Sequence, residues 1–143
     1  MKNKQIGNLE RMVIAECVKD VPSFGKISRL FEMGADPNAV NEYGECVLGI
    51  VFEGYCSMYG TKLRSGFFAP HIVAVFLQYG FDAKRHGLKV ISELQNSCYD
   101  RYIRMAIKTI LSERNRMIKR DIAMFKNCMK SISDKVYRFL KAA

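Results

Sequence analysis

The chain has 143 residues, of which 49% are hydrophobic and 26% charged, and its formal net charge is +9. This composition is ordinary for a soluble globular protein, and the length suits a single domain, 1–143, with a buried core. No segment approaches the roughly 20 apolar residues that a membrane-spanning helix requires, and Glu10 and Glu16 interrupt the region where a signal peptide would be apolar. We therefore expect a cytoplasmic protein with no membrane partner.

The potential metal ligands are scattered along the sequence. The two histidines, His71 and His86, stand alone, and no two cysteines form a Cys-x-x-Cys pair. A zinc site needs clustered Cys and His ligands. We therefore expect no metal and no cofactor, and we interpret the cysteines as buried thiols: Cys17, Cys46, Cys56, Cys98 and Cys128.

Two short helices are predicted at the start of the chain. Residues 8–19 place apolar side chains at helical spacing, and Pro22 ends this segment. A second helix is predicted over 24–33, with Ile27, Leu30 and Phe31 on one face. Gly34 then suits the helix end, because glycine enters the left-handed conformation at little cost.

The segment 30–48, LFEMGADPNAVNEYGECVL, reads as the joint between two helix-turn-helix units. It ends a helix at Gly34, turns at Asp36-Pro37-Asn38, and turns again at 41–44. Asn first and Gly last favour a type I turn over these four residues. A further helix is predicted to begin near Cys46.

The same pattern recurs later in the chain. Residues 73–84, VAVFLQYGFDAK, match residues 27–38, ISRLFEMGADPN, at an offset of 46, so that Gly80 aligns with Gly34. The segment 61–70, TKLRSGFFAP, reads as an inserted loop, and Pro70 suits the first turn of the helix that follows. A third, weaker copy covers 105–114, with Arg114 in place of the glycine and 88–96 as its partner helix.

The last segment, about 115–142, is predicted to be an amphipathic helix. Its apolar residues repeat at alternating intervals of four and three, and its basic residues lie on the opposite face. The first 100 residues hold 11 basic and 11 acidic side chains, whereas residues 101–143 hold 12 and 3. The apolar residues are Ile118, Ile122, Phe125, Met129, Ile132, Val136 and Phe139.

The GADPN stretch followed by a glycine turn resembles the ankyrin repeat, whose period is about 33 residues. The resemblance implies an all-α stack of about three units, over about 5–38, 39–84 and 85–114, with the helix 115–142 as a C-terminal cap. Where the family opens its first helix with Thr-Pro-Leu-His, this chain has Cys46-Val47-Leu48-Gly49, which lacks the capping threonine.

Ankyrin-like stacks are mostly binding scaffolds, and the resemblance therefore implies protein–protein interaction through hairpin tips, inner helices and the loop. Two alternatives stay open. The tyrosines of the inner helix would otherwise fill gaps in the stack, and the loop phenylalanines would cover the second unit. The candidate partner-binding residues are Val40, Glu42, Tyr43, Tyr55, Tyr59, Arg64, Phe67, Phe68 and Arg85.

Catalysis has little support in the sequence. No G-x-S-x-G, H-E-x-x-H, phosphate-binding or dinucleotide-binding fingerprint occurs. A Cys–His pair using His71 or His86 stays open, since such partners meet only in the fold. We expect that the protein is not an enzyme.

The basic helix allows three interpretations. We favour a cap whose lysines are solvated, which predicts a monomer rather than a homodimer. The four-three spacing also fits pairing with a second copy. In the third interpretation, an alternative function, the basic third binds nucleic acid with strong salt dependence, through Arg116, Lys119, Arg120, Lys126 and Lys130.

Overall fold

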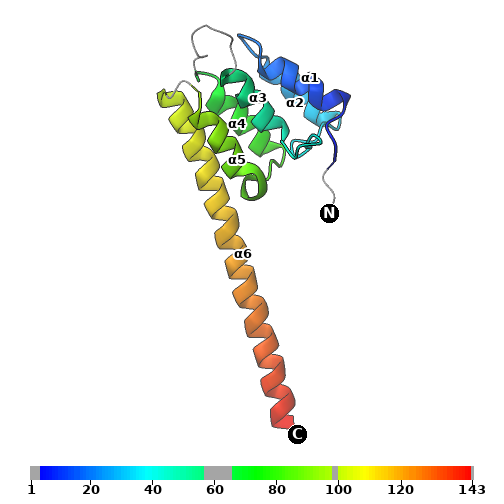
Figure 1. The fold of residues 1–143 in the computed structure, drawn as a ribbon. Helices are drawn as coiled ribbons and strands as arrows, with labels where there is room; N and C mark the ends of the chain where they lie inside the picture. The colour runs from blue at the N-terminus through cyan, green and yellow to red at the C-terminus, as the bar shows by residue number, and fades with distance from the viewer. Residues whose placement is uncertain (1–3, 57–65, 98–99, 143) are drawn as a thin grey trace.

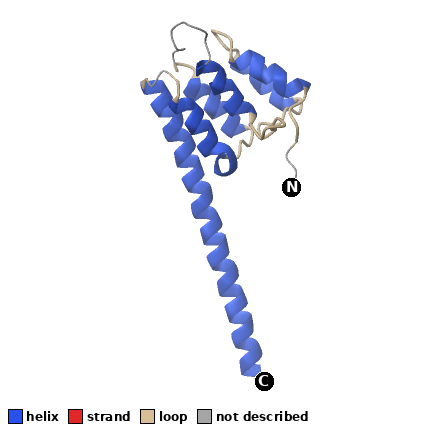
Figure 2. Ribbon diagram, in the orientation of Figure 1, coloured by secondary structure: helices blue, strands red, loops and turns tan. Residues whose placement is uncertain are grey.

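The computed structural model describes residues 4–56, 66–97 and 100–142. These residues form a compact body and one long helix that leaves it (Figure 1). The expected all-α fold is confirmed, since the described chain consists of helices joined by loops (Figure 2). The helices are α1 (Asn8–Cys17), α2 (Phe24–Glu32), α3 (Val47–Cys56), α4 (Ala69–Gln78), α5 (Ala83–Gln95) and α6 (Arg101–Ala142).

The helices of the body form two layers. In one layer α1 packs against α3 and α3 against α5; in the other, α2 packs against α4 and α4 against α6. The layers are joined where α1 contacts α2 and α5 contacts α6. Each helix contributes to one core of buried side chains, which includes Val13, Ile27, Leu48, Phe76, Leu94 and Ile103.

Helices α2 and α4, aligned by the sequence match, end in the same way. Gly34 and Gly80 have positive φ angles of 113° and 94°, which glycine adopts readily. The next residue in each case turns its N–H back onto the helix, with Ala35 donating to the Leu30 carbonyl at 3.1 Å and Phe81 to that of Phe76 at 2.9 Å. This six-to-one bond is the hydrogen bond of the Schellman motif.

The turn expected at 41–44 is confirmed. The N–H of Gly44 donates to the carbonyl of Asn41 at 3.0 Å. The Asn41 side-chain oxygen also accepts from the N–H groups of Tyr43 and Glu45, both at 2.9 Å. Val40 and Cys46 form an antiparallel bridge across this turn, so residues 39–47 make a short hairpin.

Polar side chains hold the turns of the body in place, both within a helix pair and between successive pairs. The buried carboxylate of Glu10 accepts from the N–H of Gly7 at 2.8 Å and from the N–H of Asp36 at 3.1 Å, which links α1 to the turn after α2. The Asn38 side chain bonds to the backbone of Gly80 and Asp82, which links that turn to the one before α5. Glu10 thus ties together one helix pair, whereas Asn38 joins two successive pairs, and the backbone groups of both turns find side-chain partners.

The predicted boundary near residue 114 is wrong. The third copy and the separate helix over 115–142 are one helix, α6, whose 42 residues span about 63 Å at 1.5 Å per residue. Nothing in residues 101–142 breaks a helix, because the segment contains neither glycine nor proline. The partner helix expected at 88–96 is α5, which begins earlier, at Ala83.

The expected role of residues 115–142 as a cap over the stack is also wrong for most of that segment. The buried residues of α6 are Ile103, Ala106, Ile107 and Ile110, all in its first quarter. Every described residue from 121 to 142 is exposed, and α6 runs clear of the body there (Figure 1). The first part of α6 packs on α4 and α5 instead.

Candidate functional site

The most distinctive surface is the exposed part of α6, residues 122–142, which we call the arm. Its apolar side chains and Ile118 form one stripe along the helix, called here the apolar stripe. Ile118 is half-buried at the edge of the body, and the six stripe residues in the arm are 49% to 74% exposed. The stripe is Ile118, Ile122, Phe125, Met129, Ile132, Val136 and Phe139.

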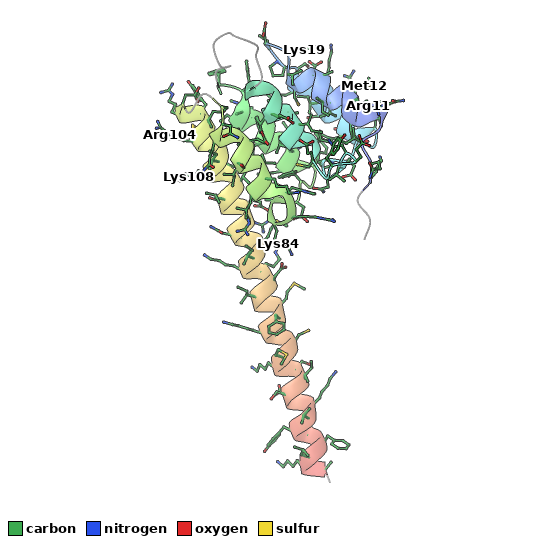
Figure 3. All side chains as sticks on the ribbon, viewed as in Figure 1. Arg11, Met12, Lys19, Lys84, Arg104 and Lys108 are labelled. Carbon is green, nitrogen blue, oxygen red and sulfur yellow. The ribbon has the colours of Figure 1, made fainter. Side chains whose placement is uncertain are left out.

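The apolar stripe is offset around the helix from the face of α6 that packs inside the body. Ile107 is buried, and seven-residue steps along α6 lead from it to Arg114 and Asp121, beside the stripe. Asp121 pairs with Lys84, which lies near the start of α5. Beyond this ion pair the helix leaves the body, and the side chains of the arm project from it on all sides (Figure 3). The apolar stripe therefore lies beside the line of residues that packs on α4 and α5 and does not continue it.

The five residues predicted to bind anions lie outside the stripe, and two of them, Lys119 and Lys126, directly flank it. All five are exposed. The Arg116 guanidinium is engaged by the Glu113 carboxylate, with Nε 3.0 Å from Oε2, and this hydrogen bond raises the pKa of Arg116. Arg116 is thus partly neutralised by its neighbour. The other four are Lys119, Arg120, Lys126 and Lys130.

The hairpin carries only part of the predicted tip surface. Tyr43 is 77% exposed, and Glu42 is exposed beside it. Val40 is buried, because its backbone bridges to Gln5 and Cys46, so its prediction as a contact residue is wrong. Arg85 is exposed near the start of α5. The hairpin and the start of α5 share one end of the stack, since Asn38 bonds to Asp82.

The prediction of Tyr55 as a partner-binding residue is wrong. Tyr55 is fully buried on α3, and its ring meets that of Phe52 edge-on, with centroids 5.2 Å apart. It fills the core, which was the alternative interpretation of the inner-helix tyrosines. Tyr59 and Arg64 lie outside the described residues.

Phe67 and Phe68 lie just before α4, at the end away from the hairpin, because α4 leads from them to the turn at Gly80. Phe68 is half-buried, and its ring lies 6.2 Å from that of Phe24. Phe67 is 48% exposed and lies 5.0 Å from both Phe68 and Tyr102. These contacts favour the covering interpretation for Phe68 and leave one face of Phe67 accessible.

A small hollow between α3 and α5 was missed by sequence reasoning. Its volume is about 160 Å³, and it is lined by Glu45, Cys46, Gly49, Lys89, Ser92 and Glu93. The pKa of nearby Glu53 is raised, first by a hydrogen bond with Glu45 and then by desolvation. No local sequence motif predicts this hollow, because its residues meet only when α3 and α5 pack together in the fold.

Cys46 and His86 lack the features of an activated nucleophile and its base. Cys46 is buried, and desolvation raises the pKa of its thiol, whereas a nucleophilic cysteine needs a lowered one. His86 is buried against Phe81, with ring centroids 6.1 Å apart, and burial together with Arg85 lowers its pKa. Within residues 4–56, 66–97 and 100–142, no group of three or more His, Cys, Asp or Glu side chains is placed to hold a metal ion.

Comparison of the chain with protein-family models, with curated proteins and with solved structures found no match. Among the helices of the described chain, none has both the length and the apolar content that a bilayer crossing requires. Among the candidate residues, exposed side chains lie along the arm and at the hairpin end.

Proposed function

We propose that the chain is a protein–protein interaction module, in which an ankyrin-like stack carries a rigid arm that binds a partner through the apolar stripe. The observation behind this proposal is the exposure of six large apolar side chains along one face of the arm. Soluble proteins seldom leave a long apolar surface of this kind uncovered unless it binds something.

The ankyrin-like description is supported by the order of the helix contacts and by the hairpin. Alternate helices pack in two parallel series, α1–α3–α5 and α2–α4–α6, as stacked helix pairs require. The hairpin at 39–47 stands between the first and second pairs, and α2 and α4 share the same glycine-ended closure. The offset of 46 residues and the length of α6 depart from the family's regular period.

The stripe favours a helical or groove-shaped partner surface. Its four-three spacing holds the apolar side chains in line along about 32 Å of helix, from residue 118 to residue 139. A helix of this kind binds by laying its apolar face into a groove or against another helix. Full burial of one such side chain contributes about 1.5–3 kcal/mol, so several together can offset the cost of association, about 4–15 kcal/mol.

Affinity capture with matched variants tests the proposal. The stripe variant carries Phe125→Asp with Ile132→Asp. The control carries Met124→Asp with Tyr137→Asp, two arm residues that are similarly exposed but lie off the stripe. From nuclease-treated lysate of the host, we expect the wild type and the control to retain a protein, whether another chain or a second copy, that the stripe variant loses. Equal retention by both variants, or no retained protein, contradicts the proposal.

The basic side of α6 supports a second candidate, nucleic-acid binding through Arg116, Lys119, Arg120, Lys126 and Lys130, because all five side chains are exposed on one side of the helix. Neutralising phosphates with basic side chains releases counterions, so binding should weaken steeply as salt rises. Titration of labelled duplex DNA and RNA at several salt concentrations tests this. Binding that is absent at low salt, or unchanged in Lys126→Glu with Lys130→Glu, contradicts it.

A further inference from the structure

We infer that the partner of the apolar stripe is the stripe of a second copy, and that two arms pair as an antiparallel coiled coil. This inference rests on the proposed function and names the occupant of its site. The expectation of a monomer depended on the stripe being covered within the chain. The exposure of the arm removes that reason.

The spacing of the stripe is that of a coiled-coil seam. Ile122, Met129 and Val136 recur every seven residues, and Ile118, Phe125, Ile132 and Phe139 recur every seven residues between them. These two series are the a and d positions of a heptad, which pack as knobs into the holes of a facing helix. In the structure this spacing falls on one continuous helix, and the stripe residues of the arm are exposed on it.

The sizes of the side chains favour the antiparallel orientation. With Phe125 set against Met129 of the second copy, Ile122 meets Ile132, and Ile118 meets Val136. By two-fold symmetry each contact occurs twice, and each phenylalanine in the centre faces a flexible methionine that adapts to its ring. In a parallel pair in register, Phe125 and Phe139 would each face their own copy, with two bulky rings in a single layer.

The charges beside the seam favour the same orientation. In an antiparallel pair, each side of the seam brings together the same flanking positions of the two helices. Asp121 then lies beside Lys135 of the second copy, and this contact occurs twice. Lys126 lies beside Lys126 of the second copy, and this contact occurs once. In a parallel pair, each side of the seam brings together different flanking positions. Asp121 then lies beside Lys126, but Arg114 lies beside Lys119, also twice. Unlike charges at these flanking positions set the orientation of coiled coils.

The body leaves room for an antiparallel partner. The two bodies stand at opposite ends of the pair, whereas parallel arms would bring both bodies to the same end, where Ile118 is already half-buried. The far end of the second arm would reach Leu111, which is 37% exposed and lies seven residues before Ile118. The second arm can thus cover the apolar stripe without displacing the helices of the body.

The charge of the arm gives the pairing a distinctive dependence on salt. Residues 122–142 hold five basic side chains and one acidic one, so two arms repel each other. Salt screens this repulsion between exposed charges and strengthens apolar burial when the salt is a sulfate or phosphate. We therefore expect dimerisation to tighten as salt rises, which is opposite to the behaviour of nucleic-acid binding.

The test uses the purified full chain in sedimentation equilibrium at low and high salt. We expect twice the chain mass of 16.4 kDa, with tighter association at high salt. Phe125→Asp should be monomeric and Met124→Asp dimeric, and circular dichroism should show equal helix content in both. A monomer at every concentration and salt overturns the inference. If the chain is monomeric but still captures another protein through the stripe, the proposed function stands and only the pairing of two arms is overturned.

Cys128 reports the orientation. It is exposed on the arm and falls on the symmetry axis of the antiparallel pair, close to its own copy, whereas parallel arms hold the two thiols on opposite sides of the seam. A short bis-maleimide should therefore join two wild-type chains but not two Cys128→Ser chains. A dimer that is not joined through Cys128 overturns the antiparallel arrangement.

Discussion

The side-chain oxygen of Asn38 accepts a hydrogen bond of 2.7 Å from the N–H of Asp82, across 44 residues of sequence. The same amide donates to the carbonyl of Gly80 at 2.9 Å. Asp82 in turn caps α5, where its carboxylate accepts from the N–H of Arg85 at 3.0 Å. One side chain thus fixes the turn that sets the start of α5 against the preceding helix pair.

Replacing Asn38 by alanine should destabilise the protein by about 1–3 kcal/mol, because the Gly80 carbonyl and the Asp82 N–H both lose their partner. The free energy of unfolding in urea measures the effect. Asn96→Ala serves as the control, since Asn96 is an exposed residue at the end of α5, and surface changes of this kind stay within about 0.5 kcal/mol. Equal values for the two variants would remove Asn38 from its structural role.

Gly34→Ala and Gly80→Ala should each cost about 1–2 kcal/mol, because a side chain disfavours their left-handed conformation. A β-carbon at either position meets nothing within 4 Å, so backbone conformation alone sets the penalty. Gly25→Ala, inside α2 and also unobstructed within 3.4 Å, should instead be neutral or stabilising. Thermal unfolding of the three variants checks this. A large difference between Gly34→Ala and Gly80→Ala would show that the two helix ends are not equivalent.

His86 should make the protein less stable in mild acid. Burial lowers its pKa in the folded state below the ordinary value of 6.5, so the unfolded chain binds this proton first as pH falls. The stabilising contribution is complete above pH 6.5 and is lost as pH falls through the lowered folded pKa. His86→Leu should flatten this part of the stability profile, measured by urea unfolding from neutral pH to below the lowered pKa. An unchanged slope would contradict the assignment.

Substitutions at Phe67 and Phe68 should distinguish a packing role of these side chains from a role in partner binding. Phe68→Ala should cost about 2 kcal/mol, near the range of about 1.5–3 kcal/mol for burying a large apolar side chain, and Phe67→Ala should cost less because its ring is half exposed. The double variant should still retain partner protein in affinity capture, since the proposed binding surface is the arm. Loss of capture at an unchanged melting temperature would transfer binding to this pair.

Local signals were enough to predict the ends of α2 and α4, the hairpin turn and the first turn of α4, but not the start of α5. Pro70 lies in the first turn of α4, as expected, and Gly34, Gly44 and Gly80 all have positive φ. In each case the residue's own conformational preference decides the outcome. The neighbours along the chain carry that information, so no tertiary contact is needed to read it.

Burial could not be predicted in the same way. Periodicity identifies the apolar face of residues 115–142 but does not say what covers it, and the alignment of a third repeat suggested an end at Arg114 that the residues themselves do not impose. Val40 and Tyr43 lie three residues apart in one hairpin, yet only Tyr43 is exposed. Their difference arises from the bridge to Gln5, which is distant in sequence.

Because the backbone of α6 is unbroken, the arm has a fixed length and a fixed rotational orientation relative to the body. Between Asp121 and the end of the helix at Ala142 lie about 32 Å of rigid rod, so anything held at its tip has a set distance and direction from Tyr43 and the hairpin. One residue inserted after Asp121 would turn the whole stripe by about 100° relative to the body, whereas seven would nearly restore its direction and only lengthen the reach. The number of residues in α6 thus sets both the distance between the apolar stripe and the hairpin and the direction in which the stripe faces.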